Sequence, residues 1–254
     1  MLIFTYDKSF DGLLSAVFEA YSRKQFPDLL LEEGASLPLF YHEVISIVSD
    51  PEKSTRVWKG LKKKLDELAL KQLMACWLSE LPEADMLLFR YIRKAIDNKR
   101  SIELNFGDPD VLEVVKISRK VQHERLRLLQ FIRFQKTGDD TYFAPMEPLF
   151  NVLPLTIDHF RDRFSDQKWL IYDLKRKYGY YYDLHEVTEV TFPDLENHHI
   201  TGKLNEALLA EDEKVFQKLW KTYFKAIAIK ERINPRLHKH NMPVRYWKHL
   251  TEKQ

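Results

Sequence analysis

The chain has 254 residues, of which 44% are hydrophobic and 31% are charged, and its formal net charge is +2. Hydrophobic residues recur along the whole sequence, which excludes an intrinsically disordered chain and predicts one compact domain over residues 1–254. The single cysteine, Cys76, excludes an intramolecular disulfide and any iron–sulfur or zinc site built on several thiolates of this chain. We therefore expect no cofactor.

The N-terminal segment does not resemble a signal peptide, because it has no basic n-region and no small-residue cleavage site. No apolar run approaches the roughly 20 residues that a membrane-spanning helix needs. These two features predict a cytoplasmic protein that does not bind membranes.

The first predicted elements are a strand over residues 2–6 and a helix that ends at about Tyr21. Ser9 or Asp11 is the expected N-cap of this helix. Gly12 follows in the first turn, but no repeated glycines and no Lys-Ser/Thr pair come after it. The turn is therefore not predicted to be a phosphate-binding loop.

Residues 41–48 form the next predicted strand. Ser49 and Glu52 have the spacing of a capping box, and Pro51 suits the first turn, so a helix is expected to begin here. Apolar positions then recur at intervals of three and four. We expect a helical region over residues 50–128.

The apolar pattern becomes strand-like after residue 128 and predicts two β-hairpins and one further strand in the same sheet. The expected strands cover residues 128–135, 141–144, 169–172, 178–182 and 187–192, with a short helix over 155–164. The predicted fold class is therefore α+β, with an antiparallel sheet of hairpins, the helical region and a long C-terminal helix.

That C-terminal helix is expected to begin at residues 211–213, whose negative charge suits a helix N-terminus, and to end at about Arg232. Its large apolar residues share one side, which predicts a face packed on the core rather than a stacking site for a cofactor. These residues are Phe216, Leu219, Trp220, Tyr223, Phe224 and Ile227.

Motifs of the common nucleotide-binding and hydrolase classes are absent from the sequence. Only seven glycines occur, with no GxGxxG, no GxxxxGK[ST] and no GxSxG. Cys76 lies in an apolar helical stretch and is expected to be a buried, inert thiol. The side chains of the neighbours His198 and His199 point apart in an extended chain, and His238 and His240 have no obvious third ligand nearby, so no metal site is predicted.

Two groups of charged residues leave alternatives open. The cations Lys59, Lys62, Lys63 and Lys64 form one cluster, which is either a polyanion surface or a solvated face. An acid-rich segment contains Glu147, Asp158, His159, Asp162 and Asp166. These residues could serve as general acids or bases in a reaction on a nucleobase, but such charges at turns and helix starts are commonly structural.

The C-terminal segment combines cations with aromatic rings, the combination that binds phosphates and unpaired bases. Its candidate nucleic-acid-binding residues are Arg236, His238, Lys239, Arg245, Tyr246, Trp247, Lys248 and His249. We expect single-stranded or damaged DNA as the partner. The alternative is that Tyr246 and Trp247 anchor the terminus while the cations stay solvated.

Three stretches carry a family resemblance: RVWKGLKKKL, the segment from FIRFQ to RFSDQKWLIYD, and ERINPRLHKHNMPVRYWKHLTE. Together they resemble a bacterial family associated with DNA repair and defined by domain of unknown function 4130. That family is found beside a radical-SAM protein and, in other proteins, fused to uracil-DNA glycosylases. The string MPVRYWKHL is the most specific part of the match.

The resemblance implies a role in DNA metabolism, with a radical-SAM DNA-repair-like protein as a second partner. It also marks Arg133, Asp166, Gln167 and Trp169 as family-motif residues, although strand alternation and a turn explain them without a ligand. We expect a DNA-binding or adaptor subunit that is not an enzyme on its own. The alternatives are an enzyme acting on a damaged or flipped DNA base, and a partner that binds protein only.

Overall fold

The computed structural model describes residues 1–192, 209–211, 213–226 and 234–253. The chain divides into two compact units, Met1–Gln122 and His123–Gln254, and each is considered by itself. Both contain helices and a β-sheet, which confirms the α+β class. Whether the two units behave as one domain stays a prediction. No described helix is long and apolar enough to cross a membrane.

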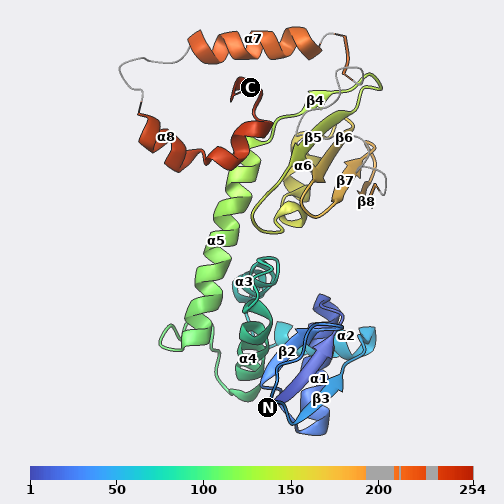
Figure 1. Ribbon diagram of the computed structural model, residues 1–254, viewed down its shortest axis with the longest axis vertical. Helices are drawn as coiled ribbons and strands as arrows, with labels where there is room; N and C mark the ends of the chain where they lie inside the picture. The colour runs from blue at the N-terminus through green and yellow to red at the C-terminus, as the bar shows by residue number, and fades with distance from the viewer. Residues whose placement is uncertain (193–208, 212, 227–233, 254) are drawn as a thin grey trace. The chain divides into compact units, whose positions relative to one another are not determined.

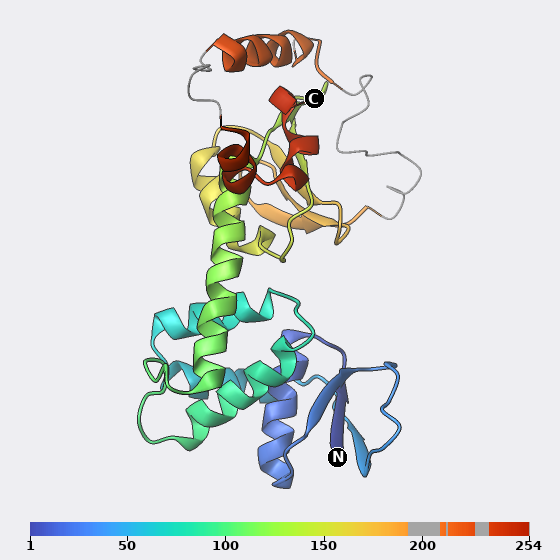
Figure 2. The ribbon, with the colours of Figure 1, turned by 60° about the vertical axis from the view of Figure 1, so that its left-hand side comes forward.

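The first unit is built around a three-stranded parallel sheet in the order β2-β1-β3 (Figure 1). Its strands are β1 (Leu2–Tyr6), β2 (Leu29–Glu32) and β3 (Glu43–Ser46). Helix α1 (Phe10–Arg23) lies alongside the sheet (Figure 2) and has Ser9 as its N-cap, with the Ser9 hydroxyl accepting from the Gly12 N–H. The predicted strands and the first helix are confirmed, whereas the parallel pairing was not anticipated.

Four further helices follow and confirm the predicted helical region: α2 (Pro51–Lys62), α3 (Glu67–Trp77), α4 (Ala84–Asp97) and α5 (Pro109–Phe131). The N-cap of α2 is Asp50, whose carboxylate accepts from the N–H groups of Glu52 and Lys53. The predicted capping box is therefore wrong, because Ser49 donates its hydroxyl to Asp7 instead. Cys76 on α3 is buried, and burial raises its pKa to about 12, as an inert thiol requires.

Helix α5 continues past the point where a strand was expected. Leu128 is buried, and its carbonyl accepts a backbone hydrogen bond from Ile132, so residues 128–131 are helical and not extended. The predicted strand over 128–135 is reduced to β4 (Gln135–Lys136). A short run of apolar residues suits either structure, and here it extends the helix that precedes it.

The second unit contains a five-stranded sheet in the order β4-β5-β6-β7-β8. The remaining strands are β5 (Tyr142–Met146), β6 (Trp169–Asp173), β7 (Tyr178–Tyr182) and β8 (Val187–Val190). Both predicted hairpins are confirmed, since β4 pairs antiparallel with β5, and β6 with β7. β5 and β6 pair in parallel, because the chain between them crosses over through η1 (Leu153–Leu155) and α6 (Ile157–Arg163).

Strand β6 forms the centre of this unit. Trp169 is 1% exposed, and its ring lies 5.4 Å from that of Tyr182 and 6.2 Å from that of Phe160. At the end of the strand, the buried Asp173 accepts from two backbone N–H groups of the following turn and pairs with Arg176 at 2.8 Å. The aromatic pattern of the sequence thus forms the core of the second unit.

Candidate nucleic-acid interface

The C-terminal segment packs inward against the second unit. It consists of α8 (Pro235–Asn241), the 3₁₀ turn η4 (Val244–His249) and the 3₁₀ turn η5 (Thr251–Lys253). Tyr246 and His249 are each 7% exposed, and the Tyr246 ring lies 5.3 Å from that of Phe131. These two residues are therefore positioned as anchors of the terminus, and they present no open face to a base.

Two cations of this segment already have carboxylate partners. Arg245 donates to Glu124, a buried residue whose second oxygen accepts from the Leu149 N–H at 2.8 Å. Lys248 lies 2.5 Å from a Glu147 oxygen. Because each positive charge is balanced by a neighbouring carboxylate, these two side chains are weaker candidates for phosphate contact than their sequence suggests.

Two other aromatic residues of the segment, Trp247 and His238, are half-buried. The Trp247 indole N–H donates to the Met242 carbonyl at 3.0 Å, and its ring lies 5.6 Å from that of His238. Arg236 and Lys239 are exposed on α8, and neither has an ion pair among the described residues. For these two cations, contact with nucleic acid stays a prediction.

The family-motif residues are not brought together as one site. Trp169 is a core residue, whereas Asp166 and Gln167 lie in the connection before β6, and Arg133 lies after α5. In the acid-rich segment, Asp158 and Asp162 pair with Arg161 on the exposed side of α6, and Glu147 pairs with the tail. No described group of three or more His, Cys, Asp or Glu residues can hold a metal ion.

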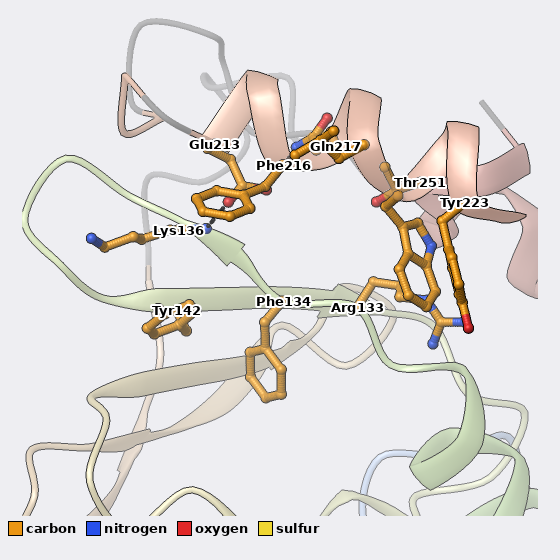
Figure 3. A pocket seen from close by; sticks show the side chains of 11 residues that line it. Arg133, Phe134, Lys136, Tyr142, Glu213, Phe216, Gln217, Tyr223 and Thr251 are labelled. Carbon is orange, nitrogen blue, oxygen red and sulfur yellow. Dashed lines mark hydrogen bonds between the residues drawn. The ribbon is translucent and has the colours of Figure 1, made fainter.

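An open cavity of about 880 Å³ lies between α7 (Glu213–Ala226), the β4–β5 hairpin and η5 (Figure 3). Figure 3 shows Phe216 and Tyr223 projecting from α7 on the side that faces Arg133 and Tyr142. Its lining is mainly aromatic, with two cations and one carboxylate. The principal lining residues are Phe134, Tyr142, Phe216, Trp220, Tyr223, Arg133, Lys136 and Glu213.

The start of α7 is tied to the edge strand β4. Glu213 is 8% exposed, and its carboxylate accepts from the Lys136 N–H at 3.1 Å and from the Gln217 side chain at 2.9 Å. The Ala210 N–H donates to the Lys136 carbonyl at 3.0 Å. These hydrogen bonds hold the helix across the strand edge while the space beneath its middle stays open.

Trp220 is fixed in the cavity wall by a chain of hydrogen bonds. Its indole N–H donates to Glu252 at 2.9 Å, and Glu252 receives two further bonds from Arg133 at 2.7 and 3.3 Å. Burial alone would raise the pKa of Glu252, but the hydrogen bonds from Arg133, from its own backbone and from Trp220 hold it below its ordinary value. The carboxylate is thus charged at neutral pH and orients the ring.

The predicted core packing of the C-terminal helix is wrong. Phe216 is 59% exposed, Leu219 58%, Tyr223 55% and Trp220 39%. Helical spacing places these residues on one side, as expected, but that side faces the open cavity instead of a packed core. Ile227 and the rest of the expected helix up to Arg232 lie outside the described residues, as do His198, His199 and the side chain of Phe224.

The lysines of α7 lie on the opposite side of the helix. Lys214, Lys218 and Lys221 have the spacing i, i+4 and i+7, which places them on one face, away from the aromatic residues. The two cations of the cavity lining are already paired, Lys136 with Asp140 at 2.8 Å and Arg133 with Glu252 at 2.7 Å. The exposed aromatic side chains of the cavity suit a flat, aromatic ligand such as an unpaired base.

Comparison with known proteins places this cavity within a recognised family region. The model of DUF4130, a domain of unknown function, matches residues 82–252. No curated protein matches the chain. A solved structure, the pGpG-specific phosphodiesterase PggH from Vibrio cholerae, is 13% identical and aligns over 90% of this chain and 100% of its own length, with a TM-score of 0.28. A likeness at that level carries no argument about function.

Proposed function

The chain belongs to the DUF4130 family, and we propose that it is a nucleic-acid-binding protein of DNA metabolism that holds an unpaired base in the α7 cavity. The observation that carries this proposal is the orientation of Trp220. Its ring is pinned through Glu252 and Arg133 at the wall of an open cavity, although it is still 39% exposed. A fixed, exposed indole is a platform ready for stacking.

The cavity favours single-stranded nucleic acid over a duplex. Stacking on Trp220 and Tyr223, whose rings lie 5.8 Å apart, requires a base that is free of its own neighbours. The volume of about 880 Å³ lies within the range of pockets that take small ligands, so one or two nucleotides fit.

Replacing Trp220 with alanine is expected to weaken binding of a fluorescent oligothymidine by about tenfold, because stacking of one base on an aromatic side chain contributes about 1–3 kcal/mol. Fluorescence anisotropy at low salt measures the change. Trp220→Phe, which keeps a ring but loses the N–H bond to Glu252, is expected to bind with intermediate affinity.

The matched control for this variant is Val215→Ala. Val215 is 58% exposed on the same helix but does not line the cavity, so its loss should leave the affinity unchanged. Equal affinities for the wild-type chain and Trp220→Ala would contradict the proposal.

A second proposed role is that of an adaptor for a partner enzyme in the cytoplasm. It is supported by the exposed apolar residues Val215 and Leu219 of α7, each 58% exposed, and by the likeness to a family that occurs beside a radical-SAM protein. Co-purification with that radical-SAM protein should survive nuclease and high salt. Loss of the complex after nuclease treatment would instead indicate bridging by DNA.

Under this proposal, the partner enzyme and not this chain carries out the reaction on the damaged nucleobase. None of the acids from Glu147 to Asp166 is among the residues that line the α7 cavity. The purified chain alone is therefore expected to leave lesion-bearing oligonucleotides intact, and product is expected only after the partner enzyme is added. Product formation by the chain alone would favour the alternative of an enzyme that acts on a damaged base.

A further inference from the structure

Helix α2 of the first unit presents a row of cations that have no acidic partner. Arg56, Lys59 and Lys63 are exposed and spaced i, i+3 and i+7, so they share one helical face. Within residues 1–122, all of which the structure describes, no carboxylate lies within 4 Å of these three charged groups. Lys53 on the same helix differs, because it pairs with Glu19 at 2.8 Å.

The row of cations borders a hollow in the surface. A groove of about 710 Å³ is lined by Thr55, Arg56, Lys59, Gly60 and Lys63, with Pro51 and Glu52 also contributing. Apart from the adjoining residues and the backbone of the helix itself, no atom lies within 4 Å of the position that a Cβ of Gly60 would take, so the groove is open over this residue. The Arg56 guanidinium stands 5.6 Å from the centre of the Phe18 ring, which supports it beside the groove.

We infer that this groove, the α2 groove, binds the phosphate backbone of duplex nucleic acid. Arg56 and Lys63 are separated by about 10 Å along the helix axis, at 1.5 Å per residue, which equals the axial rise of about three base pairs of a duplex. Uncompensated cations at that spacing neutralise neighbouring phosphates and release their counterions. The contact needs no unpaired base and therefore reads no sequence.

The residues of the α2 groove favour a nucleic-acid duplex over a membrane surface as the ligand. A membrane surface also attracts lysines, but peripheral helices insert large apolar side chains beside their cations. None of the large exposed hydrophobic residues belongs to α2. The groove residues precede residues 82–252, where the family model matches, and none of them lines the α7 cavity. The inference is thus independent of base stacking at Trp220.

The test uses the full chain and a blunt, fully paired, fluorescent DNA duplex, titrated from about 50 to about 200 mM salt. Replacing Arg56, Lys59 and Lys63 with glutamine should reduce the slope of log affinity against log salt by about three, one for each lost phosphate contact. Affinity at the low-salt end should fall at least about tenfold. The Trp220→Ala variant should bind this duplex as the wild type does, which separates the two proposals.

The matched control replaces Lys116, Arg119 and Lys120 with glutamine. These are exposed cations on α5 in the same unit, so the net charge falls by the same amount. If this control loses as much affinity as the α2 variant, the effect is one of net charge and the inference is overturned. Competition by polyglutamate that equals competition by unlabelled duplex would also overturn it, in favour of an acidic peptide.

Gly60→Gln tests the shape of the groove without changing its charge. Glutamine has the higher helix propensity, and the open space over Gly60 accepts the side chain, so the melting temperature should not fall. Duplex binding should nevertheless weaken severalfold, because the side chain fills the groove. Unchanged binding by Gly60→Gln would overturn the claim that the backbone lies in the groove.

Discussion

Replacing Arg245 with alanine is expected to lower the free energy of unfolding by about 2 kcal/mol, less than for a fully buried pair because the Arg245 side chain is 36% exposed. The side chain of Glu124 is only 2% exposed, and Arg245 is its closest cation, with Arg127 further away at 3.9 Å. Without Arg245, the Glu124 carboxylate keeps the Leu149 N–H but loses its main counter-charge. Chemical denaturation measures the loss.

A double-mutant cycle isolates the ion pair from other effects. Glu124→Gln keeps an oxygen that can accept from Leu149, and with Arg245→Met no buried charge is left unpaired. The double variant should therefore be more stable than Arg245→Met alone. A loss below about 1 kcal/mol for Arg245→Ala would show that the pair is solvated, as surface pairs are, and would contradict the inward anchoring of the tail.

Acidification should destabilise the protein through His249. This residue is 7% exposed, and neither of its ring nitrogens has a hydrogen-bond partner among the described residues. Burial, together with the nearby charge of Lys248, lowers its pKa from 6.5 to about 4, while Glu147 opposes the change. Because the unfolded chain binds this proton first, stability is complete above pH 6.5 and falls as the pH drops toward 4.

The size of this pH effect follows from the shift. Because the pKa of His249 falls from 6.5 to about 4, the free energy of unfolding is expected to drop by on the order of 3 kcal/mol between these two pH values. His249→Phe should remove that part of the pH dependence, since phenylalanine fills the site with no group to protonate. His185→Gln, at an exposed position, is the control and should keep the wild-type profile. Identical profiles for wild type and His249→Phe would contradict the burial of a neutral imidazole.

The elements that the sequence predicted well are those built from local signals. The hairpin of β6 and β7 combines alternating aromatic strands with a short turn. Ser9 caps α1 by accepting from the N–H of Gly12, three residues later. Parallel pairs carry no comparable signal. β5 and β6 are joined through η1 and α6, so nothing near either strand identifies its partner.

The candidate site was predicted only in part, for the same reason. The cations of the C-terminal tail are plain in the sequence, but the carboxylate that neutralises Arg245 lies 121 residues earlier, in α5. On α7, spacing identified which residues share a face, but not whether a core covers them. Glu252, which orients Trp220, gave no signal apart from its place in the stretch that resembles the family.

The structure therefore moves the proposed stacking site from the tail to α7. Tyr246 is buried and Arg245 is paired, whereas Trp220 and Tyr223 are 39% and 55% exposed. Loss of DNA binding after Arg245→Ala would be ambiguous, because that change also destabilises the second unit. Variants of α7 are better tests, since the exposed side of Tyr223 supports no core that the structure describes.

Base stacking in the α7 cavity is tested most directly by photo-crosslinking the full chain to an oligothymidine that carries 5-bromodeoxyuridine. The modified peptides are then mapped by mass spectrometry. Stacking in the α7 cavity predicts crosslinks at Trp220 or Tyr223 of α7, and their loss when an excess of unlabelled oligothymidine is present. Crosslinks confined to residues 234–249, with none on α7, would contradict it.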